Sequence, residues 1–184
     1  SNSPKYHDCR FEVKVDFYSQ LKGPLFYNID KIKVSGLKPN QYYKLQVIDS
    51  LSSSKTIIDE RMFKSLDIQN TKSRFALVSC MADDFRFDEI IDPMCDKLYK
   101  QNADFLILTG DLVYVDDKQF VERQKATQYD LWQRYTDCFK RIPLYHWYYL
   151  KPVFATWDDH DFGTNDGDRN FIAKDASLEI FKAA

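Results

Sequence analysis

Three carboxylates and one imidazole occupy consecutive positions in the Asp-Asp-His-Asp segment at residues 158–161. An apolar run at residues 152–156, typical of a buried strand, precedes them. Anions this close repel one another. A bound cation relieves the repulsion, because carboxylate oxygens and neutral imidazole are ligands of divalent and trivalent metals. The segment therefore predicts metal-assisted chemistry.

Two further polar clusters follow apolar runs in the same way. Residues 74–80 form a nearly continuous apolar run that ends at Cys80, and the run at residues 104–109 is followed by Asp111 and Tyr114. Such runs are typical of strands that are covered on both faces. Ligands bind at the carboxyl ends of strands in α/β sheets. The three clusters are therefore expected to meet at one sheet edge, provided that the strands are neighbours.

The residues after position 72 alternate between predicted strands and predicted helices, which is typical of an α/β fold. One helix is expected to begin at Asp92, with Asp92 as the N-cap and Pro93 at the first helical position. The predicted strands are 74–80, 104–109 and 152–156, and further helices are predicted at about 126–141 and 171–184.

The residues before position 72 have a different pattern. Residues 11–17, 31–34 and 42–48 carry apolar runs with period-2 alternation, which indicates strands with one face on a core. Turn-forming residues separate these runs, and the spacing predicts a β-sandwich. Residues 34–43 resemble the strand–corner–strand of immunoglobulin-like and fibronectin type III modules. We therefore predict a β-sandwich module over residues 1–72 and a second domain over residues 73–184.

Composition excludes several classes of protein. The chain has 184 residues and a formal net charge of −2 at pH 7, which argues against a broad nucleic-acid-binding surface. No stretch approaches the ~20 consecutive apolar residues of a membrane span. The four cysteines form no CxxC pair, so neither a zinc knuckle nor a disulfide scaffold is expected.

Taken together, the three clusters resemble metallophosphoesterases of the alkaline phosphatase D (PhoD-like) type. The matching segments are Ser79-Cys80, residues 109–114 and residues 156–161, within a resemblance that spans about residues 74–170. The resemblance implies an immunoglobulin- or fibronectin III-like β-sandwich followed by the first half of an αββα metallophosphoesterase domain. It also implies hydrolysis of a phosphate monoester or diester substrate.

The resemblance assigns metal-binding roles to four side chains. Cys80 and Tyr114 are implied ligands of one ion, Asp111 is implied to bridge two ions and to act in catalysis, and Asp159 to hold the second ion. The implied ions are iron (Fe3+) and calcium (Ca2+), or alternatively other divalent metals. A thiolate and a phenolate suit a ferric ion, and an oxygen-lined site suits calcium. Two ions about 3.5–4 Å apart can activate water and neutralise phosphoryl oxygens.

Two more residues receive roles from the resemblance. His160 takes the place of the catalytic histidine that stabilises the phosphoryl transition state in the wider group, and Asn165 lies where family members carry asparagines near the phosphate. The residue types alone allow simpler roles. By base rate a cysteine such as Cys80 is a small buried apolar residue, and Tyr114 alone reads as a packing aromatic.

Other residues near the clusters are expected to be structural. Asp158 is expected to hold the backbone of its loop, Asp161 to orient His160, and Asp166 to form a turn. Arg134 lies on a predicted helix and is expected to be solvated.

The family pattern continues with a Gly-Asp…His segment that these 184 residues do not contain. We therefore expect the chain to be a fragment, inactive alone, whose site is completed by a companion C-terminal segment. The alternative function is a catalytically inactive phosphoesterase-like module that binds a ligand or partner through an aromatic patch at residues 145–149. Family members are commonly exported, which favours an extracytoplasmic (periplasmic or secreted) location, with any leader outside this chain.

Overall fold

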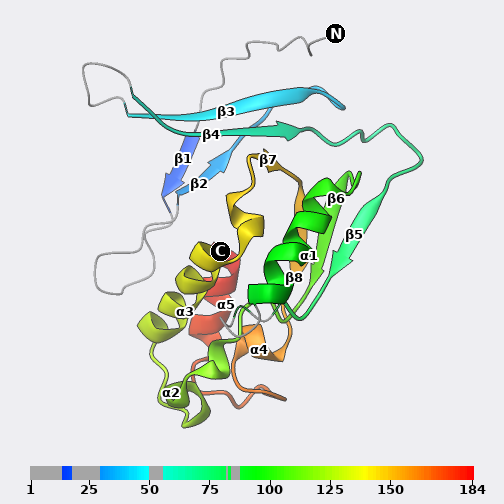
Figure 1. The fold of residues 1–184 in the computed structure, drawn as a ribbon. Helices are drawn as coiled ribbons and strands as arrows, with labels where there is room; N and C mark the ends of the chain where they lie inside the picture. The colour runs from blue at the N-terminus through cyan, green and yellow to red at the C-terminus, as the bar shows by residue number, and fades with distance from the viewer. Residues whose placement is uncertain (1–13, 18–29, 50–55, 82, 84–87) are drawn as a thin grey trace.

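The computed structural model of the protein describes residues 14–17, 30–49, 56–81, 83 and 88–184 (Figure 1). Within these ranges the structure is mixed α/β, with three small sheets and helices that gather around the C-terminal one. Of the predicted strand 11–17, residues 11–13 lie outside the described ranges. No helix in the described part of the chain has the length and apolar character needed to cross a membrane.

Two sheets contain the N-terminal strands. β1 (Lys14–Phe17) pairs antiparallel with β2 (Asp30–Lys33), and β3 (Tyr42–Asp49) pairs antiparallel with β4 (Thr56–Lys64). The first three match predicted strands, whereas the sequence pattern did not predict β4. Its middle reads Asp59-Glu60-Arg61, a charged triplet that hides the period of two. These charges are accommodated by ion pairs on the sheet surface, Arg61 with Asp59 at 2.9 Å and Lys44 with Glu60 at 3.3 Å.

The β3–β4 sheet also contains a strand from the second predicted domain. β7 (Tyr149–Leu150) pairs in parallel with β4, with Met62 opposite Tyr149. The N–H of Met62 donates to the carbonyl of Tyr148 at 2.8 Å, and Nη1 of Arg61 donates to the carbonyl of Trp147 at 2.9 Å. The two predicted units, 1–72 and 73–184, therefore share a sheet.

The C-terminal sheet consists of three parallel strands in the order β5 (Phe75–Val78), β6 (Phe105–Thr109) and β8 (Val153–Thr156). All three were predicted. Their neighbour relation satisfies the condition under which the polar clusters that follow them meet at one edge.

One face of this sheet carries the hydrophobic core. Leu106 and Leu108 on β6 are fully buried against α1 (Asp88–Lys100), α3 (Gln128–Arg141) and α5 (Lys174–Ala183). In Figure 1, α3 and α5 lie side by side, and short helices connect the elements. The short helices are η2 (Val115–Asp117), α2 (Gln119–Glu122), η3 (Pro143–His146) and α4 (Asp159–Phe162).

The opposite face of the C-terminal sheet is open. Phe75 is 56% exposed, Leu77 62% and Phe154 53%. The ring of Phe105 stacks on Phe75 at 5.7 Å between centroids and meets Phe154 edge-on at 5.5 Å. Parallel sheets are normally covered on both faces, so this apolar surface lacks a layer in the described part of the chain.

The prediction that a helix begins at Asp92 is wrong, because α1 begins by Asp88 and contains Pro93 in its interior. The apolar face of α1 includes both Ile91 and Cys95, which are buried and four residues apart. Helical packing therefore starts before the proline, which removes only one backbone hydrogen bond of the helix. The next predicted helix agrees with α3, whose N-terminus is fixed by a capping box between Thr127 and Asp130.

Candidate metal centre

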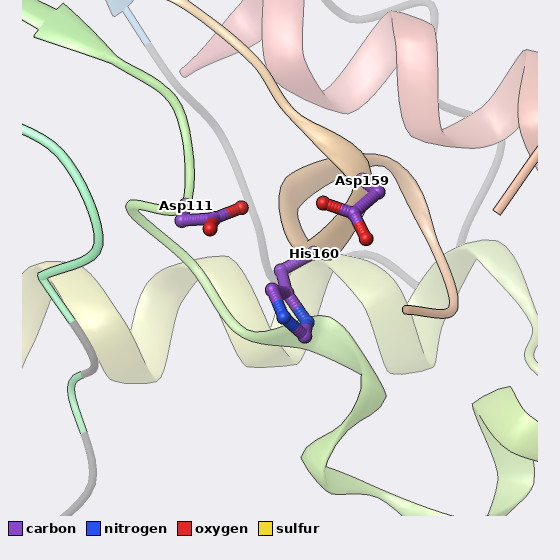
Figure 2. Close-up of side chains that lie close together, drawn as sticks. All are labelled: Asp111, Asp159 and His160. Carbon is purple, nitrogen blue, oxygen red and sulfur yellow. The ribbon is translucent and has the colours of Figure 1, made fainter. Parts of the chain in front are cut away.

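The three polar clusters meet at the carboxyl edge of the β5–β6–β8 sheet. Side-chain ligand atoms of Asp111, Asp159 and His160 all lie within 4.8 Å of one another (Figure 2). The thiol of Cys80 contacts Oδ2 of Asp111 at 3.4 Å. The ring of Tyr114 stacks on His160 at 4.2 Å between centroids. The structure thus brings five of the six predicted site residues into one neighbourhood.

Left-handed backbone conformations carry two of these side chains into place. Cys80 has φ of 54° and Asp111 has φ of 55°, values that non-glycine residues adopt at a cost. The loops that hold them run side by side, because the N–H of Cys80 donates to the carbonyl of Gly110 at 3.2 Å and that of Met81 to the carbonyl of Asp111 at 2.9 Å. Such strain in a polar cluster is typical of functional sites.

Gly110 allows the tip of β6 to approach the tip of β8. Its φ is +98°, and a Cβ placed on it would lie 2.5 Å from Cβ of Asp158. No side chain fits at that distance, so Gly110 permits the contact that brings Asp111 next to the segment at 158–161.

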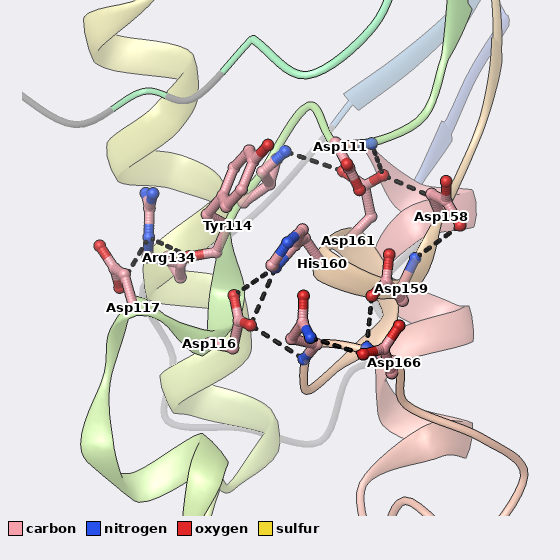
Figure 3. Close-up of polar contacts among 12 residues, drawn as sticks. Asp111, Tyr114, Asp116, Asp117, Arg134, Asp158, Asp159, His160, Asp161 and Asp166 are labelled. Atoms are coloured by element: carbon pink, nitrogen blue, oxygen red, sulfur yellow. Dashed lines mark hydrogen bonds and ion pairs between the residues drawn. The ribbon is translucent and has the colours of Figure 1, made fainter. Parts of the chain in front are cut away.

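Asp161 fixes the backbone beneath the centre. Its carboxylate is buried and accepts N–H bonds from Asp111 at 2.7 Å, Leu112 and Val113 at 2.8 Å, and Asp158 at 3.0 Å (Figure 3). Burial raises the pKa of the Asp161 carboxyl, and these four N–H groups oppose that rise. The carboxylate therefore ties the β6 tip to α4.

The prediction that Asp161 orients His160 is wrong, because Asp116 performs that role. Nδ1 of His160 lies 2.8 and 2.9 Å from the two carboxylate oxygens of Asp116. Asp161 occupies the N3 position of α4, and its carboxylate turns back to the N-cap as part of a capping box with Asp158. The structural role predicted for Asp158 agrees with its position as this N-cap.

Asp116 also raises the proton affinity of His160. Burial lowers the pKa of the imidazole, but the hydrogen bond and negative charge of Asp116, with the charges of Asp111 and Asp159, outweigh burial and raise the pKa above its usual value. The bond to Asp116 engages Nδ1 and leaves Nε2 as the nitrogen available to another group. The sequence signal for Asp116 was its position two residues after Tyr114, which alone does not reveal a partner on α4.

Cys80 and Tyr114 lie on the other side of Asp111. Burial raises the pKa of the Tyr114 phenol, and the neighbouring Asp111 and Cys80 side chains raise it further. The phenol therefore stays protonated unless a cation compensates the charges around it. Cys80 is a free, exposed cysteine, so the simpler role of a buried apolar residue does not apply to it.

Asp111 has an unsatisfied oxygen. Its Oδ1 is buried and has no hydrogen-bond partner within the described residues. A buried anionic oxygen without a partner is costly. Asp159 already accepts the N–H of Asp166 on one oxygen, as the turn predicted at Asp166 brings that N–H close. A cation between Asp111 and Asp159 would satisfy both carboxylates, and the thiol, phenol, carboxylate and imidazole groups present are chemically suited to hold one.

Asn165, predicted to bind substrate, lies in the loop after α4 beside the centre. Its side-chain amide donates to Asp166 at 2.8 Å, and its backbone N–H donates to Asp116 at 2.9 Å. These bonds stabilise the loop after α4. Asn165 and His160 also share Asp116, because both contact its carboxylate.

The arginine prediction is also wrong. Arg134 is 5% exposed and forms a two-pronged ion pair with buried Asp83. An arginine on a helix is usually solvated, but Asp83 provides a matching carboxylate that no spacing in the sequence reveals.

The aromatic patch at residues 145–149 contacts its own molecule. Trp147 packs on Tyr99 of α1, Tyr145 packs on Phe139 of α3, and the hydroxyl of Tyr148 donates to Glu60 of β4 at 2.8 Å. These contacts anchor the patch to the fold, while Tyr148 and Tyr149 remain 42% and 49% exposed.

No protein-family model matches the chain, and no curated protein matches it either. The PhoD-like resemblance therefore stays a prediction from the motifs.

Proposed function

We propose that the chain is part of a metal-dependent phosphoester hydrolase of the PhoD-like type. The observation that carries this proposal is the buried Oδ1 of Asp111, which has no hydrogen-bond partner among the described residues and lies among a thiol, a phenol, a second carboxylate and an imidazole. A carboxylate in this position with one oxygen free is suited to a cation shared by the two sides of the centre.

The side chains divide into two groups around Asp111. Cys80 and Tyr114 on one side offer the soft and phenolic ligands that suit a ferric ion, and Asp159 on the other side offers the oxygens that suit calcium or another divalent ion. When bound, such ions supply Lewis-acid activation of water and neutralise phosphoryl charge.

His160 acts as the proton donor in the proposed hydrolysis. Its raised pKa favours the imidazolium, and Asp116 holds the ring by Nδ1. Nε2 can then donate to a phosphoryl oxygen or to the departing alkoxide, an interaction that strengthens as negative charge develops. Asp116 thus acts on the substrate only through the histidine.

Two finer aspects of the fold belong to the same proposal. We infer an immunoglobulin-like sandwich at the N-terminus, supported by the Tyr43 hydroxyl, which accepts the N–H of Lys38 at 2.7 Å in the manner of a tyrosine corner. We also infer that the C-terminal sheet is half of an αββα domain, supported by its open face around Phe75, Leu77 and Phe154. A companion segment with an apolar sheet is proposed to cover that face and to contribute the remaining ligands.

The substitution Asp111→Asn tests the function. We expect it to lower iron and calcium content in elemental analysis of this chain, because an amide cannot compensate a cation as a carboxylate does. With the companion segment present, hydrolysis of p-nitrophenyl phosphate and bis-p-nitrophenyl phosphate should fall by more than the ~10–100-fold that loss of an outer partner costs. The matched control is Asp96→Asn, an exposed residue of α1 paired only with Lys100 among the contacts described. Unchanged metal content and turnover in Asp111→Asn would contradict the proposal.

A further inference from the structure

One buried arginine lies behind the Cys80–Tyr114 side of the centre. Arg134 on α3 is 5% exposed, and its guanidinium donates from all three nitrogens. Nη1 and Nη2 donate to the carboxylate of Asp83, the first at 2.6 Å. Nε donates to the backbone carbonyl of Tyr114 at 3.0 Å and to Asp117 at 3.3 Å.

These contacts join the loops that carry the two side chains. Asp83 lies three residues after Cys80, and its own side chain is only 1% exposed. The backbone carbonyl of Asp83 also accepts a hydrogen bond, from Nε of Arg141 at 2.6 Å. The guanidinium that pairs with Asp83 also donates a hydrogen bond to the backbone carbonyl of Tyr114. A single planar group therefore links Asp83, in the loop after Cys80, to the backbone at Tyr114, in addition to the backbone bonds of Cys80 and Met81 with the β6 tip.

The other side of the centre has supports of its own. Asp161 fixes the backbone at Asp111, and Asp116 holds His160. Within the described residues, Arg134 forms no hydrogen bond or ion pair with Asp159, His160 or Asp161. Arg134 bonds Tyr114 directly and reaches His160 only through the Tyr114 ring and η2, so disturbing Arg134 should affect the Cys80–Tyr114 side more than the Asp159 side.

We infer that Arg134 is a positioning residue for the thiol–phenol side of the metal centre, acting through Asp83 and the Tyr114 carbonyl. This inference rests on the proposed function, because it assigns the arginine to a metal half-site. The role depends on the fork geometry of guanidinium, since one group must make a bidentate bond to a carboxylate and a separate bond to a carbonyl. Lysine keeps the charge but cannot reproduce that geometry.

The test compares two metals on the same variant. In Arg134→Lys, we expect the affinity for Co2+, read from its thiolate charge-transfer absorption, to fall by about tenfold or more. The affinity for Ca2+, read by titration calorimetry, should stay within about twofold, because Asp111, Asp159 and their supports are unchanged. The matched control Arg123→Lys, at an exposed position after α2, should change neither affinity.

A second variant covers the case in which Arg134→Lys does not fold. The double substitution Asp83→Leu/Arg134→Met replaces the buried pair by apolar side chains, a change that buried ion pairs often tolerate. It should show the same selective loss of Co2+ absorption.

The possible results separate the two claims. Wild-type Co2+ absorption in Arg134→Lys would overturn the inference, and so would equal losses of Co2+ and Ca2+ affinity, which indicate a general structural role. If the wild-type chain, measured together with its companion segment, shows no thiolate–cobalt absorption and no calcium binding, the proposed function fails and the inference fails with it. If the wild-type chain binds both and the variant matches it, only the inference fails.

Discussion

At the scale of single residues, the surroundings of His160 favour the charged form of its own imidazole. It lies between the carboxylate of Asp116, at 2.8 Å, and the face of the Tyr114 ring, at 4.2 Å between centroids. The imidazolium form is favoured by the acceptor and by the neighbouring carboxylates of Asp111 and Asp159. Its state therefore reports on the geometry of the whole centre.

Removal of the Asp116 charge should lower the pKa of His160. In metal-free protein, we expect Asp116→Asn to have a lower His160 pKa than wild type. Burial lowers this pKa, and the substitution removes the main influence that opposes burial, leaving only the smaller effects of the Asp111 and Asp159 charges. The folded pKa of the wild type is raised above 6.5, so the stability contributed by the pair is complete below about pH 6.5 and is lost as pH rises through the folded pKa. The imidazole proton shifts in NMR and the free energy of unfolding against pH give the two measurements.

The control for that experiment is Asp96→Asn, which removes an exposed carboxylate on α1. An Asp116→Asn variant with the wild-type His160 pKa, and with the same fall in stability above pH 6.5, would contradict the assignment of Asp116 as the partner of His160.

At the scale of elements, the centre depends on how closely the tips of β6 and β8 approach. Gly110→Ala should weaken that approach, because its Cβ would lie 2.5 Å from Cβ of Asp158 and its φ of +98° is unfavourable for alanine. We expect a loss of about 1–3 kcal/mol in the free energy of unfolding, together with reduced metal affinity, measured by urea denaturation and by metal titration.

Gly36→Ala provides the matched control, since Gly36 also has a positive φ, 76°, but lies before β3. It should lose stability without losing metal affinity. Wild-type metal affinity in Gly110→Ala would show that the contact between the two strand tips does not shape the centre.

The elements near the site were more predictable from sequence than their contacts. Strands β5, β6 and β8 are continuous apolar runs, which is the pattern typical of parallel strands with two covered faces. That pattern can be recognised locally in the sequence. β4 has a mixed pattern because ion pairs on its surface replace apolar alternation. Asp116, Asp83 and Arg134 were not assigned their roles, because each acts through a partner on another element and no spacing along the chain encodes that distance.

At the scale of the whole molecule, the open face of the C-terminal sheet has the largest consequence. Phe75, Leu77 and Phe154 remain more than half exposed on it. Exposed apolar patches of this kind promote association. We expect the chain alone to self-associate through this face, and Leu77→Lys/Phe154→Lys to reduce the self-association seen by sedimentation.

Because both side chains are exposed, this double substitution should change the free energy of unfolding by only about 0.5 kcal/mol per site. Ile68→Lys/Ile172→Lys is the control, since these isoleucines are 81% and 70% exposed but lie outside the C-terminal sheet. Equal self-association in both double variants would show that the chain does not associate through the open face.

The sequence predicted the α/β class and the three C-terminal strands, but neither their order in the sheet nor the shared β4–β7 pairing. That pairing joins Met62 to Tyr149 across a long separation in the chain. A two-residue strand has too short a pattern to be recognised before its partner is known.

The central claim is that Cys80, Asp111, Tyr114 and Asp159 surround shared metal ions. Anomalous diffraction at the iron edge tests it most directly, on crystals of the protein grown with its companion segment. We expect a peak in contact with Cys80, Tyr114 and Asp111, with a second, non-iron density beside Asp159. Iron-loaded crystals with no peak among these side chains, or with their only peak elsewhere, would contradict it.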